Sequence, residues 1–331
     1  MKKFICFQIL IVFLLLSCAQ QNGKTMIDQD SVNLFPVEID GKWGYIDRRG
    51  RKIISPKYEG ALRFSDGRAL VKSDGKWGYI SRREVFAVKP EFIEAHEFSE
   101  GLAHVKIGDN YGYISKSGDF VIEPRFDAAS YFSEDLAGVK INGWWGYIDK
   151  NGYMVIPPNF GEAYSFSAGL ALVVIDGKGG YIDRSGSITI GPIYDWAEGF
   201  SEGLACVKWD GKYVYIDQTG KVIIDPSVDE AKHFSEEFAA ITKGGKQGFI
   251  DKSGKIVIEP VYQKAGDFSE GLASVLVDGK WGYIDKTGQI EIEPQFKTAI
   301  KFDGGLALVE IDDKNWGYID RKGIFVWKSK K

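Results

Sequence analysis

Short alternating apolar runs, separated by tight-turn signals, occupy most of the chain. The run LASVLV (272–277) leads into Asp278-Gly279, a pair that favours a type I′ hairpin turn, and then into KWGYID (280–285). A further turn such as DKSG (251–254) leads into a run such as KIVIEP (255–260). Proline should end this run, because it cannot donate a hydrogen bond to a β-ladder. Each unit is therefore predicted to be a three-stranded antiparallel β-meander.

The unit repeats about every 34 residues, and only the last step, from Trp281 to Trp316, is one residue longer. The position before Gly-Tyr is held by Trp43, Trp77, Tyr111, Trp145, Gly179, Tyr213, Gln247, Trp281 and Trp316. The repeats cover about residues 35–327, which predicts one tandem array of about nine units. The segment between units carries Tyr262, Ala265 and Phe268, a spacing that fits either a helical turn or a fourth edge strand.

Pairing across the hairpin predicts that both faces of each sheet are apolar. Val275 should lie opposite Gly282 and share a face with Ile284, while the other face carries Trp281 and Tyr283. A small sheet with two apolar faces must be covered on both sides, and the natural cover is the neighbouring unit. Stacked units would then build one continuous core.

The array could be open or closed. We expect an open, superhelical, solenoid-like array, because each repeat is short for a four-stranded propeller blade. The chain also begins and ends on the same strand phase, near Val37 and Val326, so no strand is left to complete a shared blade. The alternative is a closed, propeller-like toroid.

The recurring text resembles the bacterial WG-repeat family, also called KWG repeats. The resemblance rests on KWGYID at 42–47 and 280–285, with IVIEP (256–260) and FSEGLA (268–273) in fixed order between the motifs. It weakens at Gly179, at Gln247 and at Val214, where glycine is expected. The resemblance implies a bacterial origin and a β-rich repeat array, and it implies no reaction.

The N-terminal residues resemble a bacterial lipoprotein signal. Lys2 and Lys3 precede the apolar stretch 4–16, which ends in LLSC (15–18). The resemblance implies removal of residues 1–17, lipidation of Cys18 and a cell-envelope location, on the outer membrane or the periplasmic face of the inner membrane. Residues 18–34 would form a flexible tether and 35–331 the repeat domain. The alternative is an ordinary cleaved signal with a chance cysteine.

Charge and cysteine content narrow the class of protein further. Lys plus Arg number 42 and Asp plus Glu 46, a formal net charge of −4 with the two signs interspersed. This pattern lacks the basic surface that nucleic-acid binding requires. Once Cys6 and Cys18 are set aside, only Cys206 remains, in the apolar context LACVKW, where it should be a buried hydrophobe.

The repeat offers little reactive chemistry. The recurring acid after Tyr-Ile, as in Asp149, is replaced by Ser81 and Ser115, which suits a turn cap better than a metal ligand. The three histidines, His96, His104 and His233, fall in different units without metal-ligand spacing. We therefore expect no catalytic residues, no metal, no cofactor and no enzymatic activity.

The aromatic column is the strongest candidate for binding. Its members could contact a ligand or partner, although packing between units is the simpler interpretation: Trp43, Trp77, Tyr111, Trp145, Tyr213, Trp281 and Trp316. The interruptions at Gly179, Tyr213 and Gln247 could leave a groove, or they could reflect drift in a tolerant repeat. The leading hypothesis is a lipid-anchored scaffold that binds an unknown envelope protein. The alternative is a module that binds glycan or peptidoglycan.

Overall fold

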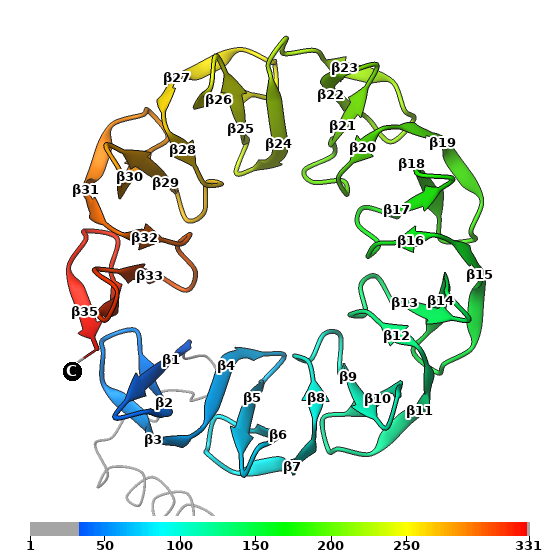
Figure 1. Cartoon of the computed structure of the whole chain (residues 1–331), viewed down its shortest axis with the longest axis vertical. Helices are drawn as coiled ribbons and strands as arrows, with labels where there is room; N and C mark the ends of the chain where they lie inside the picture. The colour runs from blue at the N-terminus through cyan, green and yellow to red at the C-terminus, as the bar shows by residue number, and fades with distance from the viewer. Residues whose placement is uncertain (1–32, 330–331) are drawn as a thin grey trace, which may run out of the picture. The chain divides into compact units, whose positions relative to one another are not determined.

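The computed structural model describes residues 33–329 as an all-β structure. Within this range, nine small antiparallel sheets stand as blades around a ring, so the described chain is a nine-bladed β-propeller (Figure 1). The expected signal segment, Cys18 and the tether up to residue 32 lie outside the described residues.

Strands follow one another in chain order within each blade. Blade 1 contains β1 (Leu34–Ile39), β2 (Lys42–Asp47) and β3 (Lys52–Tyr58). Blade 2 contains β4 (Gly60–Ser65), β5 (Arg68–Ser73), β6 (Lys76–Ile80) and β7 (Phe86–Phe92). Blade 3 contains β8 (Glu94–Ala95), β9 (Leu102–Ile107), β10 (Asn110–Ser115) and β11 (Phe120–Phe126). Blade 4 contains β12 (Ala128–Ala129), β13 (Leu136–Ile141), β14 (Trp144–Asp149) and β15 (Met154–Phe160). Blade 5 contains β16 (Glu162–Ala163), β17 (Leu170–Ile175), β18 (Lys178–Asp183) and β19 (Ile188–Tyr194).

The remaining four blades repeat this arrangement. Blade 6 contains β20 (Trp196–Ala197), β21 (Ala205–Trp209), β22 (Lys212–Ile216) and β23 (Val222–Ile224). Blade 7 contains β24 (Glu230–Ser235), β25 (Phe238–Lys243), β26 (Lys246–Asp251) and β27 (Ile256–Tyr262). Blade 8 contains β28 (Lys264–Ala265), β29 (Leu272–Val277), β30 (Lys280–Asp285) and β31 (Ile290–Phe296). Blade 9 contains β32 (Thr298–Ala299), β33 (Ala307–Glu310), β34 (Trp316–Ile319) and β35 (Phe325–Lys328).

The hairpin register is the one that the sequence predicts. Val275 pairs with Gly282 across β29 and β30, and Leu276 pairs with Trp281. The turn residues Asp278 and Gly279 have φ values of 48° and 76°, as a type I′ turn requires.

The prediction of three strands per unit is wrong for eight of the nine described blades. The segment between units forms a fourth strand at the inner edge of the next blade, so the edge-strand alternative is confirmed (Figure 1). In blade 8 this strand is only Lys264–Ala265, which pairs with Leu276 and Val275. An isolated bridge from Ser269 to Leu272 continues the contact. This four-stranded blade therefore fits into one short repeat with a brief inner strand, whereas in blades 2 and 7 the inner strand is longer, Gly60–Ser65 and Glu230–Ser235.

The prediction that proline ends the third strand is also wrong. Pro294 lies inside β31, which runs from Ile290 to Phe296. This strand is the outermost of its blade (Figure 1), and Pro294 lies between the pairs Trp281–Phe296 and Tyr283–Ile292, where the register shifts and proline has no paired residue.

Both faces of each blade are buried against its neighbours. Tyr147, Ile156 and Phe160 on one face of blade 4 pack against Val173 and Ile182 of blade 5. The same packing recurs around the ring, so each blade contacts the preceding blade with one face and the following blade with the other.

Two series of hydrogen bonds join neighbouring blades. The hydroxyl of Tyr79 donates to the carbonyl oxygen of His96 at 2.6 Å. The hydroxyl of Ser99 donates to the carbonyl oxygen of Phe132 at 2.8 Å. The tyrosine bond recurs at the same sequence separation from Tyr45, Tyr113, Tyr147, Tyr181, Tyr215 and Tyr283. The serine bond also recurs with a constant sequence separation between donor and acceptor. Its other donors are Ser65, Ser133, Ser167, Ser201, Ser235 and Ser269.

The expectation of an open array is wrong, and the closed alternative is confirmed. Blade 9 packs on blade 1, with the rings of Tyr318 and Phe35 5.3 Å apart. The Tyr318 hydroxyl donates to Pro36 O at 3.1 Å. Arg63, on β4 of blade 2, also reaches blade 9, with its Nη1 atom 3.0 Å from Asp303 Oδ2. Closure needs no blade built from both chain ends. One face of blade 9 packs against one face of blade 1, in the same way as the faces of other neighbouring blades pack.

Candidate functional site

The aromatic column lies beside the hairpin turns, on the third strand of each four-stranded blade and on β2 of blade 1. All seven predicted residues are half-buried: Trp43, Trp77, Tyr111, Trp145, Tyr213, Trp281 and Trp316. Trp43 and Trp316 stack across the ring closure with centroids 6.0 Å apart. Lys72 and Lys106 place their ammonium groups over the rings of Trp77 and Tyr111, at 5.8 and 5.2 Å. The column is thus partly used in packing, and each ring keeps an accessible part.

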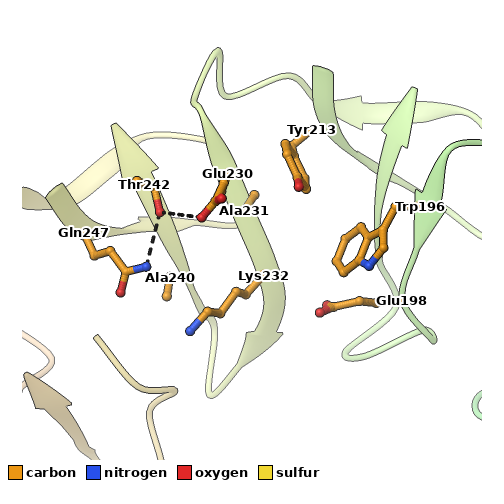
Figure 2. Close-up of a pocket in the computed structure, with 9 residues that line it drawn as sticks. All are labelled: Trp196, Glu198, Tyr213, Glu230, Ala231, Lys232, Ala240, Thr242 and Gln247. Carbon is orange, nitrogen blue, oxygen red and sulfur yellow. Dashed lines mark hydrogen bonds between the residues drawn. The ribbon is translucent and has the colours of Figure 1, made fainter. Parts of the chain in front are cut away.

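A pocket of about 250 Å³ lies between blades 6 and 7, where the column departs from tryptophan. Blade 6 contributes Trp196, Glu198 and Tyr213. Blade 7 contributes Glu230, Ala231, Lys232, Ala240, Thr242 and Gln247. Figure 2 shows Trp196, Tyr213 and Glu198 on one wall, facing the strand that carries Glu230 and Lys232.

The structure brings together two of the three interruptions in the column. Tyr213 and Gln247 both line the pocket, whereas Gly179 does not. The space beside Gly179 is filled, because a Cβ there would lie 3.2 Å from Ala197 Cβ and 3.4 Å from Leu172 Cδ1.

Of the lining residues, the sequence predictions include only Tyr213 and Gln247, and Trp196 is the aromatic residue that they missed. Its side chain is 40% exposed, and its ring meets that of Tyr213 edge to face with centroids 5.7 Å apart. A signal was present, because the same repeat position elsewhere holds no aromatic residue: Gly60, Glu94, Ala128, Glu162, Glu230, Lys264 and Thr298.

The polar side chains on the blade 7 wall are hydrogen-bonded in series. Gln247 Nε2 donates to Thr242 Oγ1 at 3.2 Å, and the Thr242 hydroxyl donates to Glu230 Oε2 at 3.3 Å (Figure 2). Gln247 Oε1 accepts the N–H of Ala265 from blade 8. The series therefore consumes the threonine donor and ends on a carboxylate, which only accepts.

Glu198, on the opposite wall, lies next to a histidine. Its Oε2 atom is buried, with no hydrogen bond of good geometry within residues 33–329, and lies 3.3 Å from His233 Nδ1. The other ring nitrogen of His233 is 3.5 Å from Asp267 Oδ2. Interaction with Glu198, and then with Asp267, raises the pKa of His233 above its usual value.

A second polar cluster lies in blade 3. The expectation that the histidines occupy different units is wrong for His96 and His104, whose rings stack with centroids 3.9 Å apart. His104 is 3% exposed and its Nδ1 has no partner within the described chain. Burial, followed by the neighbouring His96, lowers the pKa of His104 to about 3. A buried neutral imidazole is thus held in the blade.

The remaining residues with candidate chemistry have structural roles. Asp149 Oδ1 accepts the backbone N–H groups of Asn151 and Tyr153 at 2.9 Å, so the recurring acid caps a turn as expected. Cys206 is fully buried, and burial raises the pKa of its thiol. Residues 33–329 contain no cluster of three or more His, Cys, Asp or Glu side chains placed to hold a metal. In the same range no helix is long and apolar enough to span a membrane.

Known structures share the fold at low sequence identity. A crystal structure of the eukaryotic initiation factor matches with a TM-score of 0.66 and 12% identity, covering 90% of this chain and 96% of that one. The dihydro-heme d1 dehydrogenase NirN in complex with DHE matches with a TM-score of 0.50 and 14% identity, covering 91% and 73%. At these identities the likeness shows the propeller fold alone. No curated protein sequence matches the chain.

The repeat model described as "WG containing repeat" matches eight times. The matches cover residues 43–77, 77–111, 111–143, 145–178, 180–213, 215–246, 248–281 and 281–314. The first match starts at Trp43 in β2 and ends at Trp77 in β6, so one sequence repeat crosses a blade boundary. The matches cover most of the propeller, and the chain therefore belongs to the WG-containing repeat family.

Proposed function

We propose that this protein is a lipid-anchored scaffold of the bacterial cell envelope that binds another protein through the surface of its propeller. The observation that carries the proposal is an apolar surface on the outer strands of blades 2 to 4. It consists of Phe86, Phe120, Val121, Met154 and Val155 on β7, β11 and β15, and of Tyr153 directly before β15, each at least 36% exposed. Large apolar side chains exposed in number on neighbouring elements of an otherwise well-packed protein are typical of protein contact sites.

The architecture supports a rigid binding surface. Tyrosine and serine hydroxyls of successive blades are consumed in joining the blades, as in the bond from Tyr147 to Tyr164 O at 2.7 Å. Pre-organised surfaces lose little conformational entropy on binding. The lipid anchor in the proposal rests on LLSC at 15–18.

The anchor is tested by Cys18→Ser. The wild-type chain should sediment with membranes and carry acyl groups on its N-terminal peptide, whereas the variant should lose the acyl groups and the lipid-dependent sedimentation. An unmodified Cys18 peptide in the wild-type protein would contradict the anchor.

The scaffold role is tested by photo-crosslinking in intact cells. A photoreactive residue at Val121 or Val155 should give a discrete protein adduct, and the same residue at the exposed Glu259 on β27 serves as the control. Met154→Asp should abolish the adduct, because a charge would be placed on the contact surface. Absence of any protein adduct at both positions would contradict protein binding through this surface.

Glycan binding is the second candidate, supported by the accessible part of each ring in the aromatic column. Titration with soluble peptidoglycan fragments should quench tryptophan fluorescence, and Trp281→Ala should weaken the response. No response at millimolar fragment would remove this candidate.

A further inference from the structure

The pocket between blades 6 and 7 exists because two positions depart from the repeat. Gln247 stands where Trp281 stands in the next blade, so an amide replaces an indole. Trp196 stands where the next blade has Glu230, so blade 6 presents an exposed aromatic face at the same place. The cavity of about 250 Å³ is large enough for the end of one long side chain.

Carboxylates outnumber ammonium groups in the lining of the pocket. Gln247 donates to Thr242, and Thr242 donates to Glu230 Oε2, so Glu230 Oε1 takes no part in the series. The one ammonium of the lining, on Lys232, donates to Ala265 O of blade 8 at 3.2 Å. Two carboxylates, Glu198 and Glu230, therefore line the pocket against one lysine that is already engaged. A cation needs acceptors and a counter-charge, and the two carboxylates offer both.

The aromatic wall favours the same kind of group. Trp196 and Tyr213 meet edge to face, and the tryptophan side chain is 40% exposed beside Glu198 (Figure 2). The ammonium of Lys208 already lies 5.3 Å from the centroid of the Tyr213 ring, so the exposed part of Trp196 is the aromatic surface that remains for a further cation. The face of an indole attracts an ammonium or guanidinium group, and a carboxylate adds a charge-assisted hydrogen bond. His233 partly offsets the charge of Glu198, so Glu230 is the principal counter-charge.

We propose that this pocket binds a basic side chain, an arginine guanidinium or a lysine ammonium, of a partner protein. The cation would lie against the Trp196 ring and donate to Glu230. This inference rests on the proposed role in protein binding and names the chemistry of one contact. The surface on blades 2 to 4 belongs to different blades, so a partner could occupy either site alone.

Binding of the peptides Gly-Gly-Arg-Gly-Gly and Gly-Gly-citrulline-Gly-Gly to the full chain in detergent tests the proposal. Citrulline keeps the shape of arginine without its charge. Isothermal titration should show at least about tenfold tighter binding of the arginine peptide, since charge-assisted bonds are roughly twice as strong as neutral ones. Equal affinity for both peptides, or no arginine binding at millimolar peptide, would overturn the proposal.

Variants locate the binding. Glu230→Gln and Trp196→Ala should each weaken arginine binding at least about fivefold. Glu259→Gln removes the same charge from the exposed outer strand of blade 7 and should leave binding unchanged. An equal loss in Glu259→Gln would show a general charge effect and overturn the site. Gln247→Trp restores the repeat residue and should also weaken binding, with circular dichroism confirming the fold of each variant.

The two proposals can fail separately. Peptide binding without any crosslinked partner would contradict the scaffold role and keep the pocket. A crosslinked partner with no selectivity for arginine over citrulline would contradict the pocket and keep the scaffold role. A third outcome would assign the pocket to glycan instead. In that case peptidoglycan fragments would quench tryptophan fluorescence, Trp196→Ala would abolish the quenching, and the arginine peptide would not bind.

Discussion

At the scale of single residues, each repeat position performs the same task in every blade. Ile148 is fully buried and packs with Val139 of its own blade and with Tyr113 and Ile122 of the preceding blade. Asp149, its neighbour in sequence, points its carboxylate at backbone N–H groups of a turn. Adjacent residues thus differ sharply in the environment that a substitution would meet.

Ile148→Asp should destabilise the protein far more than Asp149→Ser. The first places an unpaired charge in the core between two blades and should cost about 3–5 kcal/mol or more. The second weakens a turn cap and should cost about 1 kcal/mol, since Ser115 already caps the equivalent turn through Ser117 N–H at 3.3 Å. Denaturant melts measure both, with Ile148→Val as the conservative control. The reverse ranking would show that the assignment of buried faces is wrong.

His104 should make the protein sensitive to acid. Its pKa is lowered to about 3 in the folded state, against about 6.5 when unfolded. Between these values the unfolded chain binds one proton more, so stability falls as pH falls, by about 1.4 kcal/mol per pH unit at most. His104→Leu should flatten this dependence, because Leu70 and Leu172 are buried at the same repeat position.

Melts between pH 7 and pH 4.5 measure the effect, and His233 supplies a control of opposite sign. Its raised pKa stabilises the folded state at acidic pH, and the contribution is lost as pH rises through the folded-state pKa. His233→Asn should therefore weaken the protein most at acidic pH. An unchanged pH dependence in His104→Leu would contradict the burial of a neutral imidazole.

At the scale of strands, the glycine of each WG motif lets the outer strand approach. A Cβ on Gly282 would lie 2.5 Å from Ile292 O and 2.7 Å from Pro294 N. The close contact is within one blade, where the register shifts between the pairs Trp281–Phe296 and Tyr283–Ile292. Blade 6 has Val214 at this position, and its outer strand β23 is reduced to Val222–Ile224. A side chain at this position is thus accompanied by a shortened outer strand.

Gly282→Ala should destabilise blade 8 by about 1–3 kcal/mol, as overpacking does in a tight core. Gly199→Ala is the matched control, because a Cβ there meets nothing within 4 Å. Denaturant melts measure the loss of unfolding free energy. Hydrogen exchange should show that the backbone amides of β31 exchange faster in the variant. A neutral Gly282→Ala would show that the outer strand shifts without cost.

At the scale of the whole molecule, the ring is held together by nine similar interfaces within the described range. The interface between blades 9 and 1 closes it through Phe35 and Tyr318, and an ion pair from Arg63 of blade 2 to Asp303 of blade 9 also spans the closure. Closure leaves no end blade with an uncovered apolar face, which an open array of the same units would have.

Phe35→Ala tests closure directly. Phe35 is fully buried against Tyr318, so its truncation should cost about 3–5 kcal/mol. Hydrogen exchange should rise in both terminal blades, in β1, β2, β33 and β34, and should stay unchanged in β17 and β18. Ile53→Ala on β3, where the side chain is 44% exposed, is the control. In an open array Phe35 would face solvent, and its truncation would have little effect.

Much of the blade could be predicted from nearby residues. Asp278-Gly279 specifies its turn through the positive φ values that it tolerates, and the register of Val275 with Gly282 follows from that turn. The inner strand was harder to predict, because Lys264–Ala265 is too short to show a period. Trp196 was missed because only its place beside Tyr213, which lies on another strand of the blade, makes it part of a pocket.

The amino-acid order was enough to establish the period of the repeat, the hairpins, the register and the two buried faces, since each depends on residues that are close in sequence. Ring closure and the pocket were settled only by the tertiary structure. Closure depends on the angle between blades summed over every interface, and no single repeat encodes that sum. The pocket depends on which side chains two adjoining blades present to each other, so substitutions that look like drift along the chain become neighbours in space.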